Sequence, residues 1–404
     1  MKKVYFSEID GNSMGYLAVV AILGLITALG LGAFWYMEHN GHWVTGMNNE
    51  VVWGMPHVFA VFLIVAASGA LNVASISSVF QKAAYKPLAR LSGLLALALL
   101  AGGLAVLVLD LGHPDRLIVA MTYYNFKSIF AWNIYLYIGF FVVVIVYLWM
   151  MMERKMNGFT RAAGTAAFIW RLVLTTGTGS IFGFIIAREL FDSALYAPMF
   201  IIMSFSFGLA IFILVLMAIY GGTGRPLGDA ILFRLKNLLG VFIAAVLLMV
   251  AIFYLTGLYA TEHHDVVAFI VNGDNIYTKL FWVVQIIMGS LAPLALLYNP
   301  VTGTSRGWIA IASVLVILGG LAQLYVILIG GQAFPLALFP GMEVSSSFTD
   351  GVVASYTPSL PEFLLGFSGI GIALIIVTLA LKVLGFAPNS LADADVDPHY
   401  VAAK

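Results

Sequence analysis

Residues 88–110 read LARLSGLLALALLAGGLAVLVLD, and the only charged residues of this run, Arg90 and Asp110, lie near its two ends. A helix needs about 20 mostly apolar residues to cross the hydrocarbon core of a bilayer. The run has that length, and we find ten runs like it. We therefore expect an all-α polytopic membrane protein with ten transmembrane helices. The predicted spans are 14–36, 52–80, 88–110, 128–152, 162–187, 196–220, 231–259, 277–298, 307–330 and 360–386.

The composition agrees with this class. Hydrophobic residues make up 62% of the chain and charged residues 9%, whereas a soluble domain is about half apolar and about a quarter charged. The net charge is +0, so nothing indicates a nucleic-acid partner, and the lipid bilayer is the expected surrounding. The chain has no cysteine, which excludes disulfides, a cysteine-ligated Fe–S cluster on this chain and covalently attached haem.

The spans account for almost the whole chain. Lys2 and Lys3 precede the first apolar run, but 14–36 is longer than the core of a signal peptide, so we expect a retained helix. The longest loop, about 331–359, is rich in Ser, Gly and Pro. We therefore predict one integral membrane domain over 1–404 and no soluble domain.

The basic residues indicate the orientation, because positive charge concentrates in cytoplasmic loops. With ten spans both termini lie on one side, and fourteen basic residues share that side with them, against four on the other and Arg171 within a span. We therefore expect both termini in the cytoplasm and the protein in the cytoplasmic (inner) membrane. The fourteen are Lys2, Lys3, Lys82, Lys86, Arg90, Arg154, Lys155, Arg161, Arg225, Arg234, Lys236, Arg306, Lys382 and Lys404, and the four are Arg116, Lys127, Arg188 and Lys279.

An internal repeat divides the spans into two groups. Pro56 and Pro198 occupy matching places, KPL at 86–88 matches RPL at 225–227, and KSIFAW at 127–132 matches KLFW at 279–282. The paired helices run in the same direction. We predict two parallel four-helix bundles, over 52–187 and 196–330, flanked by the helices 14–36 and 360–386.

Ionisable residues gather where the run 88–110 ends, in LDLGHPDRLIVAMTYYNFKSIFAW at 109–132. Asp110 ends the helix, and His57 is expected about 9 Å below the outer start of the preceding span, at 1.5 Å per residue. An ionisable group inside a membrane helix is a functional candidate. A histidine satisfied by a backbone carbonyl freed at Pro56, or an Asp110 paired with Arg116, is the structural alternative.

The loop beyond Asp110 allows two interpretations. His113, Asp115 and Arg116 fit a solvated turn or a docking surface as well as they fit direct chemistry. Tyr123 and Tyr124 fit an interfacial aromatic belt, and they could also line the access path of an aromatic ring.

A second polar group lies in the span 162–187. Arg171, Thr175 and Thr178 are spaced i, i+4, i+7 and so share one helix face. The arginine belongs either to a proton path or to a structural ion pair. We expect no metal site at Glu262–Asp265, because adjacent histidines point apart. We expect no haem, because His57 and His113 are the only plausible axial pair and His113 lies outside the hydrocarbon.

At WGMPHVF (53–59), YKPLARL (85–91) and LDLGHPDR (109–116) the chain resembles the NrfD/PsrC family, the quinone-reactive membrane subunits of respiratory redox complexes. The resemblance covers most of the second to ninth spans. Residues 42–75 and 109–133 look most like the DsrP branch, from the Dsr sulfite reduction-associated complexes of sulfur-metabolising bacteria.

This resemblance implies two four-helix bundles and no redox cofactor on the chain. It implies exchange of electrons between a quinol, menaquinol or ubiquinol, and a ferredoxin-like Fe–S subunit on the periplasmic face, together with other subunits of a redox complex. It places a histidine and an acid at the quinone site, where His57 and Asp110 match. Some relatives have an Asn one turn before the histidine, where this chain has Trp53.

We therefore expect a quinol-binding subunit in which His57 accepts a hydroxyl proton and Asp110 passes it outward. Neutral imidazole is suited to this step near pH 7. The expected quinone-contacting residues are Trp53, His57, Asp110, His113, Tyr123 and Tyr124, and the expected proton path is Arg171, Thr175 and Thr178. A proton-coupled secondary transporter, which favours polar groups at the midplane, and a non-catalytic membrane anchor are the alternatives.

Overall fold

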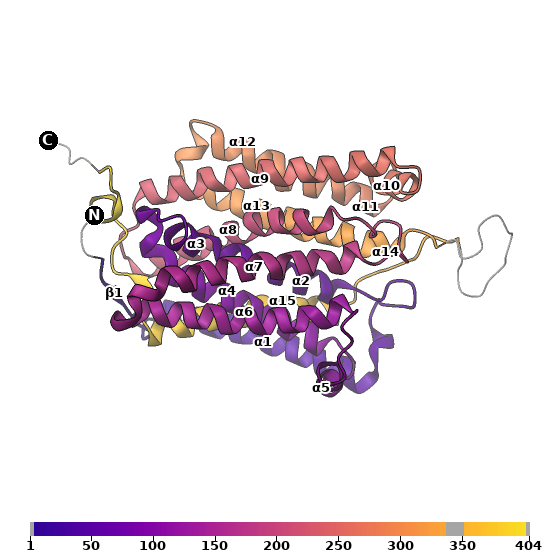
Figure 1. Ribbon diagram of the computed structural model, residues 1–404, viewed down its shortest axis with the longest axis horizontal. Coiled ribbons are helices and arrows are strands. Elements are labelled where there is room, and N and C mark those ends of the chain that lie inside the picture. The colour runs from indigo at the N-terminus through magenta and orange to yellow at the C-terminus, as the bar shows by residue number, and fades with distance from the viewer. Residues whose placement is uncertain (1–3, 337–350, 401–404) are drawn as a thin grey trace.

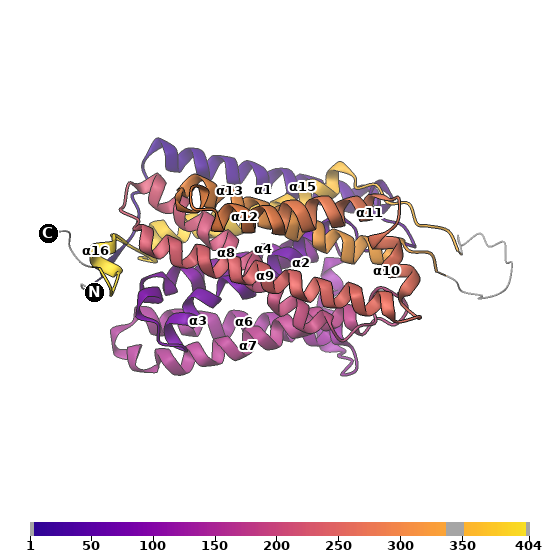
Figure 2. The same ribbon diagram turned by 90° about the horizontal axis from the view of Figure 1, so that it is seen from above.

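The long helices lie side by side along one axis, as two perpendicular views of the computed structural model show (Figures 1 and 2). The structure describes residues 4–336 and 351–400. Lys2, Lys3 and Lys404 of the charge count, and 337–350 of the predicted loop, lie outside the described residues. The described ends of the chain meet at one end of the bundle, where β1 (Phe6–Ser7) pairs antiparallel with β2 (Ala387–Pro388).

The predicted spans agree with the observed helices to within a few residues at most ends. Within the described residues they correspond to α1 (Met14–Asn40), α2 (Met55–Ala70) with α3 (Asn72–Ser78), α4 (Ala89–Leu109), α6 (Ile129–Met152), α7 (Thr160–Gly183), α8 (Tyr196–Thr223), α9 (Asp229–Tyr259), α11 (Ile276–Lys279) with η5 (Leu280–Leu291) and α12 (Ala292–Tyr298), α13 (Arg306–Tyr325) with η7 (Val326–Gly330) and α14 (Gly331–Ala333), and α15 (Leu360–Val383).

Shorter elements connect these helices. On the side of the termini they are η2 (Ala83–Leu88), η4 (Arg154–Phe159), η6 (Thr302–Thr304) and α16 (Asp393–Val396), and on the opposite side they are η1 (His42–Val44), η3 (Pro114–Arg116), α5 (Leu117–Thr122) and α10 (His264–Val271). The sequence analysis predicted none of them. Each is too short to show a clear hydrophobic period.

Nine helical segments of the described chain are long and apolar enough to cross a membrane. The predicted span 162–187 forms α7, which packs between α6 and α8 but is not among the nine. Its average polarity is raised by groups that face the protein interior, such as Arg171 and Thr175, both buried. The total of ten spans therefore stays a prediction.

α2 is at the centre of the molecule. Within the segment Met55–Ser78, 94% of the residues in an apolar stretch of 18 are buried, whereas the corresponding share in α1 is 17%. α2 contacts α4, α8, α13 and α15, whereas α1 packs mainly on α15. A helix that is apolar all round is suited to such a buried place. The contacts also join α6 to α7, α8 to α9, and α13 to η5, while the division into two four-helix bundles stays a prediction.

Glycines allow α2 and α8 to cross closely. A Cβ at Gly69 would overlap the carbonyl oxygen of Ser204, and one at Gly208 would overlap the backbone nitrogen of Ala70. Only a residue without a side chain fits on either side of this crossing. It joins the helices that begin the two predicted bundles.

Candidate functional site

A cavity of about 410 Å³ lies at the end of the bundle remote from the termini, bounded by α2, α4, α5, α6 and α7. Its wall is mostly apolar, and a few polar groups converge on it. Sites for small organic ligands commonly have this character. The lining residues are Trp53, His57, Val61, Ile64, Leu104, Leu107, Val108, Leu111, Leu117, Met121, Phe130, Asn133, Ile134, Tyr137, Ile138, Thr178, Ile181, Phe182 and Leu328.

His57 lies in the first turn of α2. The helix begins at Met55 after the extended residue Gly54, and Pro56 occupies its first turn, where a missing N–H costs no hydrogen bond. The prediction that His57 lies about 9 Å inside the helix is therefore wrong, because residues 52–54 are not helical and His57 is about 3 Å from the helix start. The Gly-Met-Pro sequence was the available signal for this boundary.

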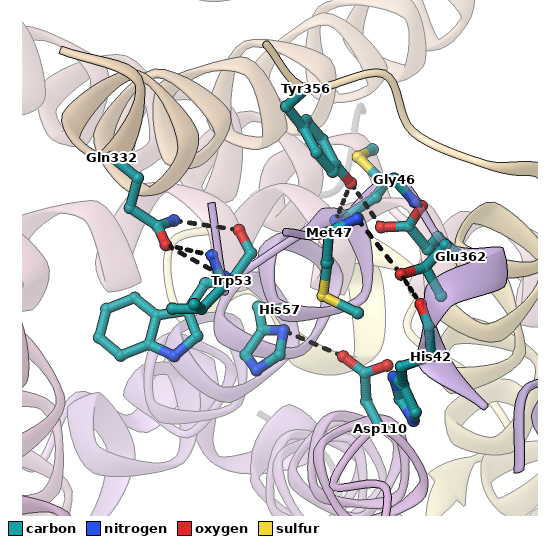
Figure 3. A network of polar contacts seen from close by, with 12 residues as sticks. His42, Gly46, Met47, Trp53, His57, Asp110, Gln332, Tyr356 and Glu362 are labelled. Carbon is teal, nitrogen blue, oxygen red and sulfur yellow. Dashed lines mark hydrogen bonds and ion pairs between the residues drawn. The ribbon is translucent and has the colours of Figure 1, made fainter. Parts of the chain in front are cut away.

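His57 and Asp110 form a pair (Figure 3). Nδ1 of His57 lies 3.0 Å from Oδ2 of Asp110, and the side chains are 20% and 1% exposed. Asp110 follows the last residue of α4, where the partial charge of the helix end is negative and disfavours a carboxylate. The imidazole is therefore the compensating partner of this acid, in place of the Arg116 considered above.

Aromatic rings form one wall of the cavity around Trp53. The indole lies 6.4 Å from the His57 ring, centroid to centroid, at an interplanar angle of 28°. Phe130, Phe182 and Phe191 surround it at centroid distances of 5.7–6.1 Å. A flat ring can stack on such a wall, with the polar His57–Asp110 pair beside it.

Asn133 adds a second polar point to the wall. Its Nδ2 donates to the carbonyl oxygens of Ile129 and Gly177, at 2.9 and 3.0 Å. Thr178 donates to its Oδ1 at 3.4 Å. The sequence analysis did not select Asn133, because one amide within an apolar helix gives no sequence signal of its partners.

The segment before α2 is held by a clamp of remote residues. Gln332 Oε1 accepts hydrogen bonds from the backbone nitrogens of Val52 and Trp53, and Gln332 Nε2 donates to the Trp53 carbonyl oxygen. Arg188 donates to the carbonyl oxygens of Gln332 and Glu50. Burial lowers the pKa of Arg188, and the charge of Glu50 opposes that shift. These bonds fix the backbone that carries Trp53 into the cavity wall.

Glu362 holds the same segment from the other side (Figure 3). This fully buried carboxylate accepts hydrogen bonds from the backbone nitrogens of Gly46 and Ser359, at 2.8 and 2.7 Å, and from the Tyr356 hydroxyl at 2.7 Å. Burial first, and then Glu362, raise the pKa of Tyr356, so the phenol stays protonated and donates. The Tyr356 oxygen in turn accepts from the Met55 nitrogen. The sequence S-L-P-E at 359–362 is a capping box and was the available signal.

His42 lies beside Asp110 in the view of Figure 3. Its Nε2 is buried without a hydrogen-bond partner among the described residues, as are both carboxylate oxygens of Asp110 apart from the contact with His57. A Cβ at Gly112 would lie 3.5 Å from this nitrogen. His42 is not among the residues that the sequence predicted for the site.

Residues 43–337 match the family described as Polysulphide reductase, NrfD. That range is more than half of the chain. The chain belongs to the NrfD family. The matched range contains α2 to α14 and leaves α1 and α15 outside, as the resemblance at WGMPHVF, YKPLARL and LDLGHPDR had indicated. With its nine apolar helices among the described residues, this NrfD-family chain is a multi-pass membrane protein.

Its relatives are membrane or C subunits of oxidoreductases. The Hdr-like menaquinol oxidoreductase integral membrane subunit of Archaeoglobus fulgidus is 31% identical over 400 residues, which cover 98% of this chain and 99% of the relative. The C subunit of the selenate reductase of Mesobacillus selenatarsenatis is 24% identical, with 95% and 94% covered. The polysulfide reductase C polypeptide of Wolinella succinogenes is 24% identical, with 71% and 96% covered.

Of the six residues expected at the quinone, only Trp53 and His57 line the cavity of this NrfD-family chain. Asp110 contacts His57 but is not itself a lining residue, and the other three lie outside the cavity. The His113 side chain is 68% exposed and lies 3.8 Å from Asp115. Tyr123 is 84% exposed. Tyr124 packs edge-to-face with Phe126 and Tyr135 and is not among the lining residues. The short helix α5, which the sequence analysis did not predict, forms part of the rim in their place.

Arg171, Thr175 and Thr178 all lie on the buried face of α7. The Arg171 guanidinium lies 4.9 and 5.0 Å from the rings of Phe168 and Phe205. It has no acidic partner in the described part of the chain, where its Nε and Nη1 are buried without hydrogen bonds. Of the three residues, only Thr178 lines the cavity.

The two histidines of Glu262–Asp265 form hydrogen bonds to backbone carbonyl oxygens. His263 and His264 donate through Nδ1 to the carbonyl oxygens of Glu189 and Leu258. Burial, followed by the charge of Asp265, raises the pKa of Glu189. Over 4–336 and 351–400 no cluster of three potential metal-ligating residues was found.

Proposed function

We propose that this NrfD-family chain is the membrane subunit of a respiratory redox complex and oxidises a quinol, or reduces a quinone, in the cavity at Trp53, His57 and Asp110. The observation that carries the proposal is the buried His57–Asp110 pair at the edge of an aromatic cavity. The relative from Archaeoglobus fulgidus, named for menaquinol, favours menaquinol as the substrate.

His57 has the geometry of a proton acceptor. Its Nδ1 faces Asp110, so the carboxylate favours the tautomer in which Nδ1 carries hydrogen and Nε2 is a free base. Oxidation of a quinol releases two electrons and two protons. Nε2 accepts one hydroxyl proton as the electrons leave, and the carboxylate stabilises the imidazolium that forms. The second hydroxyl proton follows the same route after the first has passed outward.

Asp110 and His42 supply the next positions for that proton. In the view of Figure 3 the carboxylate of Asp110 lies between the rings of His57 and His42, and its oxygens are buried. Nε2 of His42 is free to accept a proton and pass it toward the loop 41–54. His42 is therefore part of the proposed proton exit, a role that was not predicted for it from the sequence.

The electrons pass to a partner, because this chain has no cysteine with which to hold a cluster. We assign that role to a ferredoxin-like Fe–S subunit on the periplasmic side, together with further subunits of the complex. The relatives are named as subunits of oxidoreductases, which supports such an assembly. The DsrP-like sequence at 42–75 and 109–133 supports a role in sulfur metabolism.

α7 supplies a candidate route toward the other end of the molecule. Thr178 and Asn133 lie at the cavity, and the Thr175 hydroxyl lies within hydrogen-bonding distance of Ser68 Oγ, at 2.6 Å, and of the Arg171 carbonyl oxygen, at 2.7 Å. These hydroxyls lie along the helix between the cavity and Arg171. We assign Arg171, Thr175 and Thr178 to a proton path along α7.

The test uses the complex purified through this chain, with menaquinol-dependent reduction as the readout. His57→Ala should slow turnover by about 10²-fold or more, the range of general base catalysis. His113→Ala is the matched control, since that side chain is exposed outside the cavity, and it should retain turnover. Near-normal turnover of His57→Ala, with all subunits present, would discard the site and favour a non-catalytic anchor.

A further inference from the structure

A second large cavity, of about 530 Å³, lies at the end of the bundle where the termini meet. Residues of α3, η2, α4, α6, η4 and the start of α7 form it, with Phe6 of β1 and Gln81. Lys86, Arg90 and Arg161 line it, and no acidic side chain is among its lining residues in the described part of the chain. The cavity is thus an unneutralised cationic pocket, separate from the one that contains His57.

The three cations differ in how firmly they are held. Arg90 donates to the carbonyl oxygens of Gly385 and Met151, at 3.2 and 2.9 Å, and its guanidinium lies 4.1 Å from the Phe6 ring centroid. Lys86 and Arg161 are exposed. Lys86 and Arg161 make no side-chain hydrogen bond or ion pair within the part of the chain that the structure describes. Arg90 therefore places a fixed positive charge in the wall of the pocket, whereas Lys86 and Arg161 remain free to bind an anion.

Uncharged polar groups complete the lining. Ser77 and Ser78 are the last residues of α3, and Gln81 follows this helix with a positive φ of 56°. Asn157 of η4 and Thr160 of α7 also line the pocket. Ser77 and Ser78 donate to the Ala74 carbonyl oxygen, at 2.8 and 3.0 Å. Small hydroxyl and amide groups beside free cations match the several oxygens of a phosphate.

Apolar groups adjoin the same pocket. Met151 and the Tyr147 ring line it, and the exposed side chains of Phe80, Trp149 and Phe159 come from the segments that form it. A free phosphate ion gains nothing from contact with apolar side chains, whereas a phospholipid carries acyl chains that pack against them. Basic pockets between transmembrane helices bind anionic headgroups in this way.

We propose that this pocket binds the phosphodiester headgroup of an anionic phospholipid, with Lys86 and Arg161 on the phosphate and Arg90 behind them. The quinone substrate is the less suitable occupant, because the lining has no acid or base pair like His57–Asp110. The lipid would join η2 to η4 and so connect α4, α6 and α7 at this end.

The experiment measures phospholipid binding by native mass spectrometry of the full chain in detergent with added phosphatidylglycerol, and the Tm of the same sample. Lys86→Ala with Arg161→Ala should weaken retention by about 10- to 30-fold, because each basic residue near an anionic headgroup contributes roughly a fivefold factor. The rise in Tm that the lipid causes should disappear as well.

The control is Arg154→Ala with Lys155→Ala, which removes the same charge from exposed positions of η4 that do not line the pocket. It should keep full retention. Equal weakening in both double variants would overturn the proposal, since only net charge would then matter. Equal stabilisation by phosphatidylcholine would overturn it too, as would full stabilisation by inorganic phosphate or by an acidic peptide.

Discussion

Asp110→Asn is the substitution that separates proton transfer from substrate binding. The amide has nearly the same shape as the carboxylate, so the cavity and the stacking surface of Trp53 remain. The variant removes the negative charge that lies 3.0 Å from His57 Nδ1. That charge stabilises the imidazolium formed when His57 accepts a proton, and the neutral amide does so far less.

The size of the effect follows from this contact. A hydrogen bond to a charged group contributes about 1.5–3 kcal/mol. If that stabilisation is lost only when the imidazolium forms, turnover falls by about 10- to 150-fold. The apparent quinone affinity should change by less than about threefold, because the apolar lining that holds the ring is unaltered.

The assay is menaquinol-dependent reduction of the purified complex, with kcat and KM measured separately and the presence of every subunit verified on the same sample. Asp115→Asn is the matched control, because it removes the same charge from a side chain that is 76% exposed. A fall in kcat below twofold for Asp110→Asn would refute the reasoning. A rise in KM without a fall in kcat would also refute it, by showing that the acid binds substrate and does not assist the base.

Three further outcomes are expected. Reporter fusions after Glu262 should be periplasmic and fusions after Lys155 cytoplasmic, from the fourteen-to-four distribution of basic residues, and the reverse pattern would put the cavity on the wrong side. Arg171→Leu should reduce membrane-potential generation in proteoliposomes more than it reduces electron transfer, whereas equal loss with poor assembly would indicate a structural role. Glu362→Ala should cost about 3 kcal/mol or more of stability by leaving buried donors unpaired and should lower the Tm, with Glu362→Gln giving partial recovery, and an unchanged Tm would show that the clamp is dispensable.

The family match includes the residues of the proposed quinone site. The match covers 43–337, so it includes Trp53, His57 and Asp110 but not Glu362. In this chain α15 anchors the loop before α2 through Glu362. A relative that replaces Glu362 would need another acceptor for the same backbone nitrogens.

The sequence alone determined the membrane class and the positions of most helices, because the length of an apolar run and the place where it ends are local properties. The boundary of α2 was missed, since Val52 and Trp53 are as apolar as a helix needs but precede the Gly-Met-Pro sequence at 54–56, where the helix starts. α7 shows the complementary case. Its buried Arg171 and Thr175 lower its apolarity without preventing it from packing between neighbours.

Only the tertiary structure decided which polar groups meet. His57 and Asp110 could be placed at the ends of two spans, but their contact depends on how α2 and α4 pack against each other. Gln332 reaches Trp53 across 279 residues of sequence, and Glu362 reaches Gly46 across 316. Such bonds leave no periodic pattern, because each side chain is selected by a backbone group that is distant in sequence. For the same physical reason His113 and Tyr123, which are close to Asp110 along the sequence, lie outside the cavity, while Asn133 lines it.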